Sequence, residues 1–208
     1  WSHEQIEALL DDLFAWADSD DPYYLLGQAI VAPSNGTREW ALVDGQQRVT
    51  SIYLILTAIL KSLEGVGALT SDDYSIRDAA MKLHTILVMS DPVTTSPISR
   101  VLTAKGGDEF VSLLREGKPL PGTENLTQEN IKANYDEIRE RVTAAFPAEK
   151  SLVKFLNKLL NGVWLIRLEM KAEDQALEIF EKINNRGLAL NSADLLKNLL
   201  FQEVSADD

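Results

Sequence analysis

Cysteine is absent from this chain of 208 residues, and histidine occurs only twice. The lack of cysteine excludes disulfides, thiolate metal sites and cysteine nucleophiles. Because His3 and His84 are the two histidines of the chain, a histidine-based metal centre or catalytic triad is not expected.

Long uninterrupted apolar runs are also missing. Ser51, Thr57 and Lys61 interrupt the longest apolar helical pattern, whereas a bilayer requires about 20 consecutive apolar residues. We therefore expect no membrane-spanning segment. The start of the chain lacks the charged and apolar regions of a secretory signal, which favours a cytoplasmic location.

A basic surface is lacking as well. The chain carries 20 Lys and Arg against 32 Asp and Glu, a formal net charge of −12. This balance opposes a broad electrostatic grip on a nucleic-acid backbone, so any such contact must be local. Many of the acids lie in the first 21 residues, a pattern typical of a solvated face.

Hydrophobic periodicity predicts a helix-dominated α+β fold. Ser2 and Gln5 form a capping-box pattern before an amphipathic helix. The apolar runs 23–31 and 38–43, separated by an Asn-Gly turn signal, predict a β-hairpin, and run 162–170 predicts a third strand of one small sheet. Further helices are expected near residues 46–62, 75–89, 107–115, 127–146, 149–161, 174–185 and 191–204, with a short strand near 98–102 and a linker at 117–127.

The segment DGQQR, residues 44–48, lies where the second strand of the hairpin meets a helix. Asp44 and Gln47 have D-x-x-Q capping spacing, and Gly45 would ease the turn, so a purely structural interpretation is available. The alternative is an anion site. A helix start offers free N–H groups and partial positive charge, and Arg48 could grip phosphate oxygens. Gln46 and Gln47 could then hydrogen-bond a phosphate, a base or an attacking water, and Asp44 could hold Mg²⁺.

A second polar stretch, FEKINNRGLALNSADLLKN, links two helical patterns near the end of the chain. Its structural interpretation is a helix-loop-helix in which Gly187 stops the first helix. Its functional interpretation is a set of polar side chains that converge on an anionic ligand, namely Asn184, Arg186, Asp194 and Lys197. On that interpretation we expect Arg186 to share a cleft with Arg48, because one cation neutralises a triphosphate poorly.

Together, the segments YYLLGQAIV, ALVDGQQRVTSIYLIL, VWLIRLEM and IFEKINNRGLALNSADLLKN resemble the N-terminal domain family of GmrSD-type modification-dependent restriction enzymes. That family includes SspE-like effectors of phosphorothioation-dependent phage defence. The resemblance covers nearly the whole chain, with residues 65–160 matching as generic helices. A strand with an I-P-x-Y-Q-R-like motif, usual in the family before the position of Trp1, is not in this sequence.

The resemblance implies a small ParB/sulfiredoxin-like sheet core with added helices, made from residues 1–65 and 162–208 around a helical insertion at 66–161. It also implies binding and hydrolysis of a nucleoside triphosphate with Mg²⁺. The implied catalytic residues are Asp44, Gln46, Gln47 and Arg48, with Asp44 also the metal ligand. The implied nucleotide-binding residues are Gly45, Arg48, Asn184, Arg186 and Lys197.

The partners implied by the resemblance are a separate C-terminal nuclease domain and, through the full-length protein, DNA. Formation of a homo-oligomer is compatible with it. Two alternatives stay open: a non-hydrolytic module that senses DNA backbone or modified DNA, and a structural helical scaffold. Neither the preferred base nor the DNA modification follows from the sequence.

Overall fold

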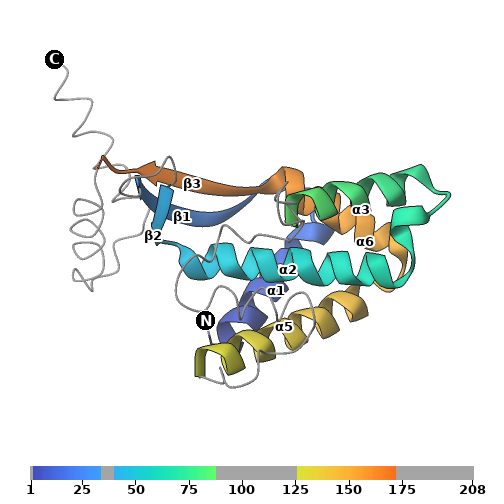
Figure 1. Ribbon diagram of the computed structural model, residues 1–208, viewed down its shortest axis with the longest axis horizontal. Coiled ribbons are helices and arrows are strands. Elements are labelled where there is room, and N and C mark those ends of the chain that lie inside the picture. Colours follow the sequence, from blue (N-terminus) through green and yellow to red (C-terminus); the bar gives the residue numbers. More distant parts are fainter. Residues whose placement is uncertain (1, 34–39, 88–125, 172–208) are drawn as a thin grey trace, which may run out of the picture. The chain divides into compact units, whose positions relative to one another are not determined.

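The computed structural model describes residues 2–33, 40–87 and 126–171, with side chains in the last range from residue 130. Helices dominate the described residues, with a small three-stranded sheet, so the predicted α+β class is confirmed. The elements, labelled in Figure 1, are α1 (His3–Asp18), β1 (Tyr24–Pro33), β2 (Trp40–Asp44), α2 (Gln46–Gly65), the short 3₁₀ helix η1 (Ala68–Thr70), α3 (Tyr74–Leu87), α5 (Leu126–Ala145), α6 (Glu149–Gly162) and β3 (Val163–Glu169).

The chain divides into two compact units. One comprises Trp1–Leu26 and Gln47–Leu165, and the other comprises Gly27–Gln46 and Ile166–Asp208. The chain passes from one unit to the other within β1, at the start of α2 and within β3. The DGQQR segment therefore contributes residues to both units.

A continuous apolar core holds the first unit together. Helix α1 buries one face at helical spacing, as its stripe of apolar residues predicts. Helix α2 buries every residue from Leu54 to Leu60, which explains why its sequence is apolar on all sides there. The Ser2 N–H donates to Gln5 Oε1 at 2.9 Å, the reach-back bond of the predicted capping box.

The end of α1 is joined to α6 by a lysine and a glycine. Lys158 Nζ donates to the carbonyl oxygens of Trp16 at 2.7 Å, Ala17 at 3.2 Å and Ser19 at 2.6 Å. These contacts add a charged donor to carbonyl groups at and just beyond the helix end, where intrahelical donors are lacking, and Trp16 O also accepts from the Ser19 N–H at 3.1 Å. Gly162 lies so close to α1 that an added Cβ would be 2.6 Å from the Trp16 ring.

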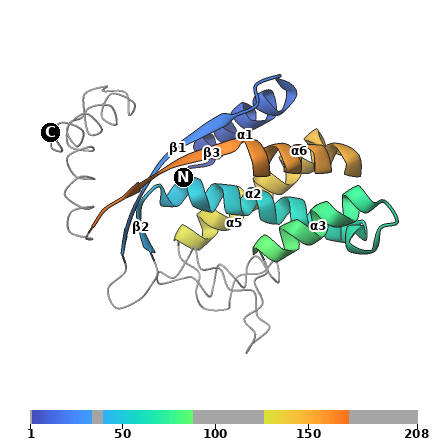
Figure 2. The ribbon, with the colours of Figure 1, turned by 90° about the horizontal axis from the view of Figure 1, so that it is seen from above.

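In the sheet, the strand order is β2-β1-β3. Strands β1 and β2 are antiparallel, with a register shift between Ile30 and Val31. Strand β3 runs parallel to β1, because the Tyr23 and Trp164 rings contact each other beside the start of both strands and the Met170 N–H donates to Val31 O near their ends. Figure 2 shows the two strands curving side by side.

The second unit has a small apolar core of its own. Ile30 and Ala32 of β1 are fully buried, and Val43, Leu168 and Met170 pack against them. The predicted hairpin and the predicted third strand are therefore both confirmed. Their inward-facing residues come from all three strands, as expected for one packed face of a small sheet.

The predicted helices of the described ranges all form, with small changes at their ends. Helix α2 continues three residues beyond the predicted end at 62, since Leu63 is fully buried and Lys61 pairs with Glu64 at 2.9 Å. The short helix η1 was not predicted. The Asn35-Gly36 turn, residues 117–125 of the predicted linker and the elements predicted at 98–102, 107–115, 174–185 and 191–204 lie outside the described residues. The last two residues of the predicted linker, 126 and 127, begin α5 instead.

Two further predictions concern larger features of the chain. None of the helices in the described ranges has the length and apolar character that crossing a membrane demands. The division into segments 1–65, 66–161 and 162–208 that complete one domain stays a prediction.

Candidate functional site

The turn between β2 and α2 is the centre of the candidate site. Strand β2 ends at Asp44, Gly45 has φ = +89°, and α2 begins at Gln46 (Figure 1). Gly45 thus occupies the N-cap position, and Asp44 lies one residue before it. A D-x-x-Q capping box needs its aspartate at the N-cap itself, so the capping interpretation of Asp44 and Gln47 does not describe this helix start.

Gly45 is required by the fold. Its backbone has a φ of +89°, which L-residues rarely adopt. It is also buried against β1, where an added Cβ would be 3.0 Å from Gln28 O and 3.1 Å from Ala29 Cα. The turn therefore needs a glycine whether or not a ligand approaches it, and Gly45 alone does not distinguish a ligand site from a tight turn.

Gln46 holds the turn in place. Its side-chain Nε2 donates to the main-chain oxygen of Leu42 at 2.8 Å, so the amide folds back onto the strand that precedes it. Leu42 is paired with Val31 of β1, which ties this hydrogen bond to the sheet. With its nitrogen engaged, Gln46 has its Oε1 atom left as an acceptor.

Gln47 and Arg48 follow in the first turn of α2. Gln47 is exposed, and its main-chain oxygen accepts a 2.9 Å hydrogen bond from the Ser51 hydroxyl. Arg48 is half-buried and interacts within the chain. Of the two, Gln47 has the side chain more accessible to a ligand.

The electrostatics of this helix start favour an anion. The first turn of α2 contains no acidic residue, so no carboxylate inside that turn compensates the partial positive charge of this 20-residue helix. The Asp44 carboxylate, two residues before the helix, opposes that charge from outside the turn. Arg48 adds a full positive charge there. Free N–H groups, helix dipole and guanidinium are the components of a phosphate site at a helix N-terminus.

The donor set at the turn fits Mg²⁺ that is carried by a phosphate. Asp44 is half-buried and supplies the single carboxylate of the segment. Mg²⁺ in nucleotide sites is commonly held by one or two carboxylates together with phosphate oxygens and water. The same set would be too small to hold the ion without a nucleotide.

The second predicted constellation, Asn184, Arg186, Asp194 and Lys197, lies outside the described residues. The predicted proximity of Arg186 to Arg48 falls outside them too. The described part of the candidate site is therefore the segment Asp44 to Arg48.

An aromatic and a cationic side chain near the sheet were not predicted from the sequence. The Arg167 guanidinium of β3 lies 4.7 Å from the ring centroid of Trp40, the first residue of β2. Arg167 Nε is also 3.2 Å from Glu169 Oε1. The sequence pattern of each strand predicts which of its residues lie on the same face of the sheet. It does not predict that β2 and β3 lie on either side of β1, and this strand order brings Arg167 and Trp40 together.

The fold and this turn define a class: a helix-dominated α+β domain in which a strand passes through a glycine into a polar helix start that suits an anion. Comparison with protein families matches residues 1–201 to the GmrSD restriction endonuclease, N-terminal domain. The chain belongs to this family, and it is thus a domain of restriction-type defence enzymes. Among curated proteins, none matches the chain at a significant level.

Proposed function

We propose that this domain binds a nucleoside triphosphate at the start of α2, hydrolyses it, and thereby controls a nuclease carried by a separate C-terminal domain. The observation that carries the proposal is the acid-free first turn of α2, which follows a glycine-dependent turn and bears Arg48. Family membership places the domain in a restriction enzyme, where a regulatory step before DNA cleavage has an evident use.

Each residue of the segment has a distinct part in this proposal. The main-chain N–H groups after Gly45 bind phosphate oxygens, and Arg48 neutralises the charge that develops during transfer. Gln47, exposed at the helix start, orients the attacking water. Gln46, held by Leu42, fixes the turn and offers its Oε1 atom as an acceptor. Asn184, Arg186 and Lys197 complete the binding of the nucleotide.

Hydrolysis at such a site needs positioning and charge stabilisation, without a covalent intermediate. Asp44 would hold Mg²⁺, which when bound neutralises phosphate charge. The half-buried position of Asp44 suits a carboxylate that is ordered before the ligand arrives. A ParB/sulfiredoxin-like core, a cytoplasmic location and the capacity to form a homo-oligomer belong to the same proposal.

We assign the nuclease to another domain because this chain shows no nuclease motif and is acidic overall. It has two histidines, no cysteine and no His-Asn-His pattern, and its net charge is −12. Cleavage generally requires a metal-polarised phosphate with an activated water, or a covalent nucleophile. DNA then reaches this domain only through the full-length protein.

Multiple-turnover phosphate release tests the proposal. The chain is incubated with Mg²⁺ and GTP, ATP, CTP or UTP in turn, and the Gln47→Ala and Arg48→Ala variants are compared with it. Arg139→Ala, which removes an exposed arginine on α5, is the matched control. We expect turnover that falls at least about 100-fold in both site variants and is unchanged in the control.

The outcomes also separate this proposal from a second candidate. Saturable binding of nucleotide without turnover would contradict hydrolysis and favour a non-hydrolytic module. In that case the same helix start would contact a DNA phosphate or a modified backbone, which its local positive charge allows despite the acidic surface. Neither binding nor turnover of any nucleotide would contradict the proposed site itself.

A further inference from the structure

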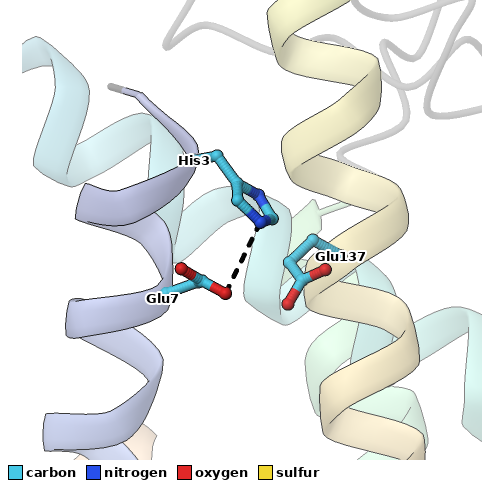
Figure 3. A group of neighbouring side chains, drawn as sticks. All are labelled: His3, Glu7 and Glu137. Carbon is cyan, nitrogen blue, oxygen red and sulfur yellow. Dashed lines mark ion pairs between the residues drawn. The ribbon is translucent and has the colours of Figure 1, made fainter.

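One histidine and two glutamates gather on the face where α1 and α5 pack together. His3 and Glu7 lie one turn apart on α1, and Glu137 extends from α5 (Figure 3). One potential ligand atom from each residue lies within 4.8 Å of the other two. Since i,i+4 spacing places two side chains on the same helical face, α1 supplies two donors and α5 supplies the third.

The spacing of the donors suits a bound ion better than a direct hydrogen bond. His3 Nε2 is 3.5 Å from Glu7 Oε1, beyond the 2.7 to about 3.2 Å range of N–H···O hydrogen bonds. Ligand atoms that share a tetrahedral ion with bonds of about 2.0 to 2.1 Å are about 3.3 Å apart. A small movement of either side chain would place both at coordination distance.

Arg141 fixes the two helices relative to each other beside this cluster. It donates from Nη1 to Glu7 O at 3.3 Å and from Nη2 to Asp11 Oδ1 at 2.5 Å. Its Nε is 4.0 Å from Glu137 Oε1, which is too long for a hydrogen bond, so this ion pair leaves the Glu137 lone pairs available for a ligand. The cluster is thus held on a packed helix pair, and the Glu137 side chain is only 23% exposed.

We propose that His3, Glu7 and Glu137 form a binding site for a first-row transition-metal ion such as Zn²⁺, which ties α1 to α5. An imidazole nitrogen with two carboxylates is a donor set that Zn²⁺ accepts, whereas Mg²⁺ and Ca²⁺ prefer oxygen alone. Water takes the fourth position. This site uses no residue of the DGQQR segment and does not depend on the nucleotide chemistry proposed above.

From the sequence, a histidine-based metal centre was not expected, because the chain has only two histidines. In the structure, one histidine is joined by two glutamates, and the second of these, Glu137, is 130 residues away from Glu7 in the sequence. The His-x₃-Glu spacing at the start of α1 is the part of this site that the sequence alone could have indicated. The third ligand depends on the packing of α5 against α1.

Metal titration tests the proposal directly. The chain is stripped with a chelator, and Zn²⁺ binding is measured by competition with a chromophoric chelator, with Co²⁺ absorption as a report on coordination. We expect one equivalent to bind, and His3→Ala and Glu137→Gln to weaken that binding at least about tenfold. His84→Ala removes the other histidine, in the last turn of α3, and should leave binding unchanged.

A thermal melt supplies a second readout. With free Zn²⁺ at about 100 times its dissociation constant, the Tm should rise by about 5–10 °C. The rise should vanish in His3→Ala, whose melt without metal should match that of the unsubstituted chain. Absence of stoichiometric binding, or equal binding by the His3 and His84 variants, would overturn the proposal and would indicate loose association with surface carboxylates.

Discussion

Replacing Gly45 by alanine is the sharpest test of the turn that starts α2. The substitution adds one methyl group at a buried position with φ = +89°. That methyl carbon would lie 3.0 Å from Gln28 O, 3.1 Å from Ala29 Cα and 3.2 Å from Ala29 Cβ. Two of the three neighbours are main-chain atoms of β1, so they cannot move away as the end of a flexible side chain would.

The expected loss of stability is the sum of two destabilising effects, reduced by one stabilising effect. Holding a residue other than glycine in this region of φ costs about 1–3 kcal/mol. Forcing β1 away by a few tenths of an ångström adds about 1–3 kcal/mol. Alanine also reduces the conformational entropy of the unfolded chain, which stabilises the folded state by about 0.4–1 kcal/mol. With each effect near the middle of its range, Gly45→Ala should lower the free energy of unfolding by about 2–4 kcal/mol, a fall in Tm of about 5–15 °C.

Gly65→Ala is the matched control for this measurement. Gly65 is the last residue of α2, and an added Cβ there would meet no atom within 4 Å. Alanine should leave stability unchanged or raise it by up to about 1 kcal/mol, because it favours the helix. Urea and thermal melts of both variants give the comparison. A Gly45→Ala chain as stable as the Gly65→Ala chain would refute the geometry described for the turn.

Further expectations concern other parts of the first unit and the chain as a whole. Lys158→Met should lower the free energy of unfolding by about 2–3 kcal/mol, because it removes a charged donor from three carbonyls at the end of α1; an unchanged urea midpoint would contradict this. Gly162→Ala should destabilise by about 1–3 kcal/mol, since its methyl carbon would lie 2.6 Å from the Trp16 ring and 2.7 Å from the main-chain oxygen of Pro22, and a melt equal to that of the unsubstituted chain would contradict this close packing. Burial raises the pKa of Tyr135 above its usual 10.0, so the folded state favours the neutral phenol. The stability that Tyr135 contributes is therefore complete below pH 10 and is lost as the pH rises above it. Tyr135→Phe should flatten the alkaline fall in the free energy of unfolding, measured by urea titration. Plasmid DNA, modified or not, should remain intact with the chain, Mg²⁺ and nucleotide, and reproducible nicking abolished by a point change in residues 1–208 would contradict the assignment of the nuclease to another domain.

Local sequence patterns were enough for most of the described fold. The apolar stripe of α1 and its Ser2-Gln5 cap, the hairpin and the third strand all follow from spacing within a few residues. The helix start at Gln46 follows from the polar segment between an apolar strand and an apolar helix. These features depend on interactions between near neighbours, which is why periodicity reveals them.

Contacts between distant segments were not predictable in the same way. The requirement for Gly45 arises from the path of β1 past the turn, and the capping pattern of Asp44 and Gln47 is replaced because the helix begins one residue later than that pattern needs. The carbonyl groups at the C-terminal end of α1 accept hydrogen bonds from Lys158, more than 130 residues along the chain. Each of these depends on tertiary packing, which spacing in one sequence does not encode.

Part of the candidate site was predicted and part stays a prediction. The sequence indicated the polar helix start and its arginine, and the structure adds that Gln46 is engaged with Leu42 while Gln47 is exposed. The roles of these residues toward a nucleotide rest on the family resemblance and on the electrostatics of the helix start. The contribution of Arg186 stays a prediction.

Calorimetric titration with non-hydrolysable nucleoside triphosphates in the presence of Mg²⁺ tests the central claim most directly. The unsubstituted chain, Arg48→Ala and the control Arg139→Ala are titrated in parallel, and each is melted to verify that it is folded. We expect the unsubstituted chain to bind at least one triphosphate, Arg139→Ala to bind it equally, and Arg48→Ala to bind it at least about tenfold more weakly, with all three melts alike. Equal binding by a folded Arg48→Ala chain would contradict a phosphate site at the start of α2.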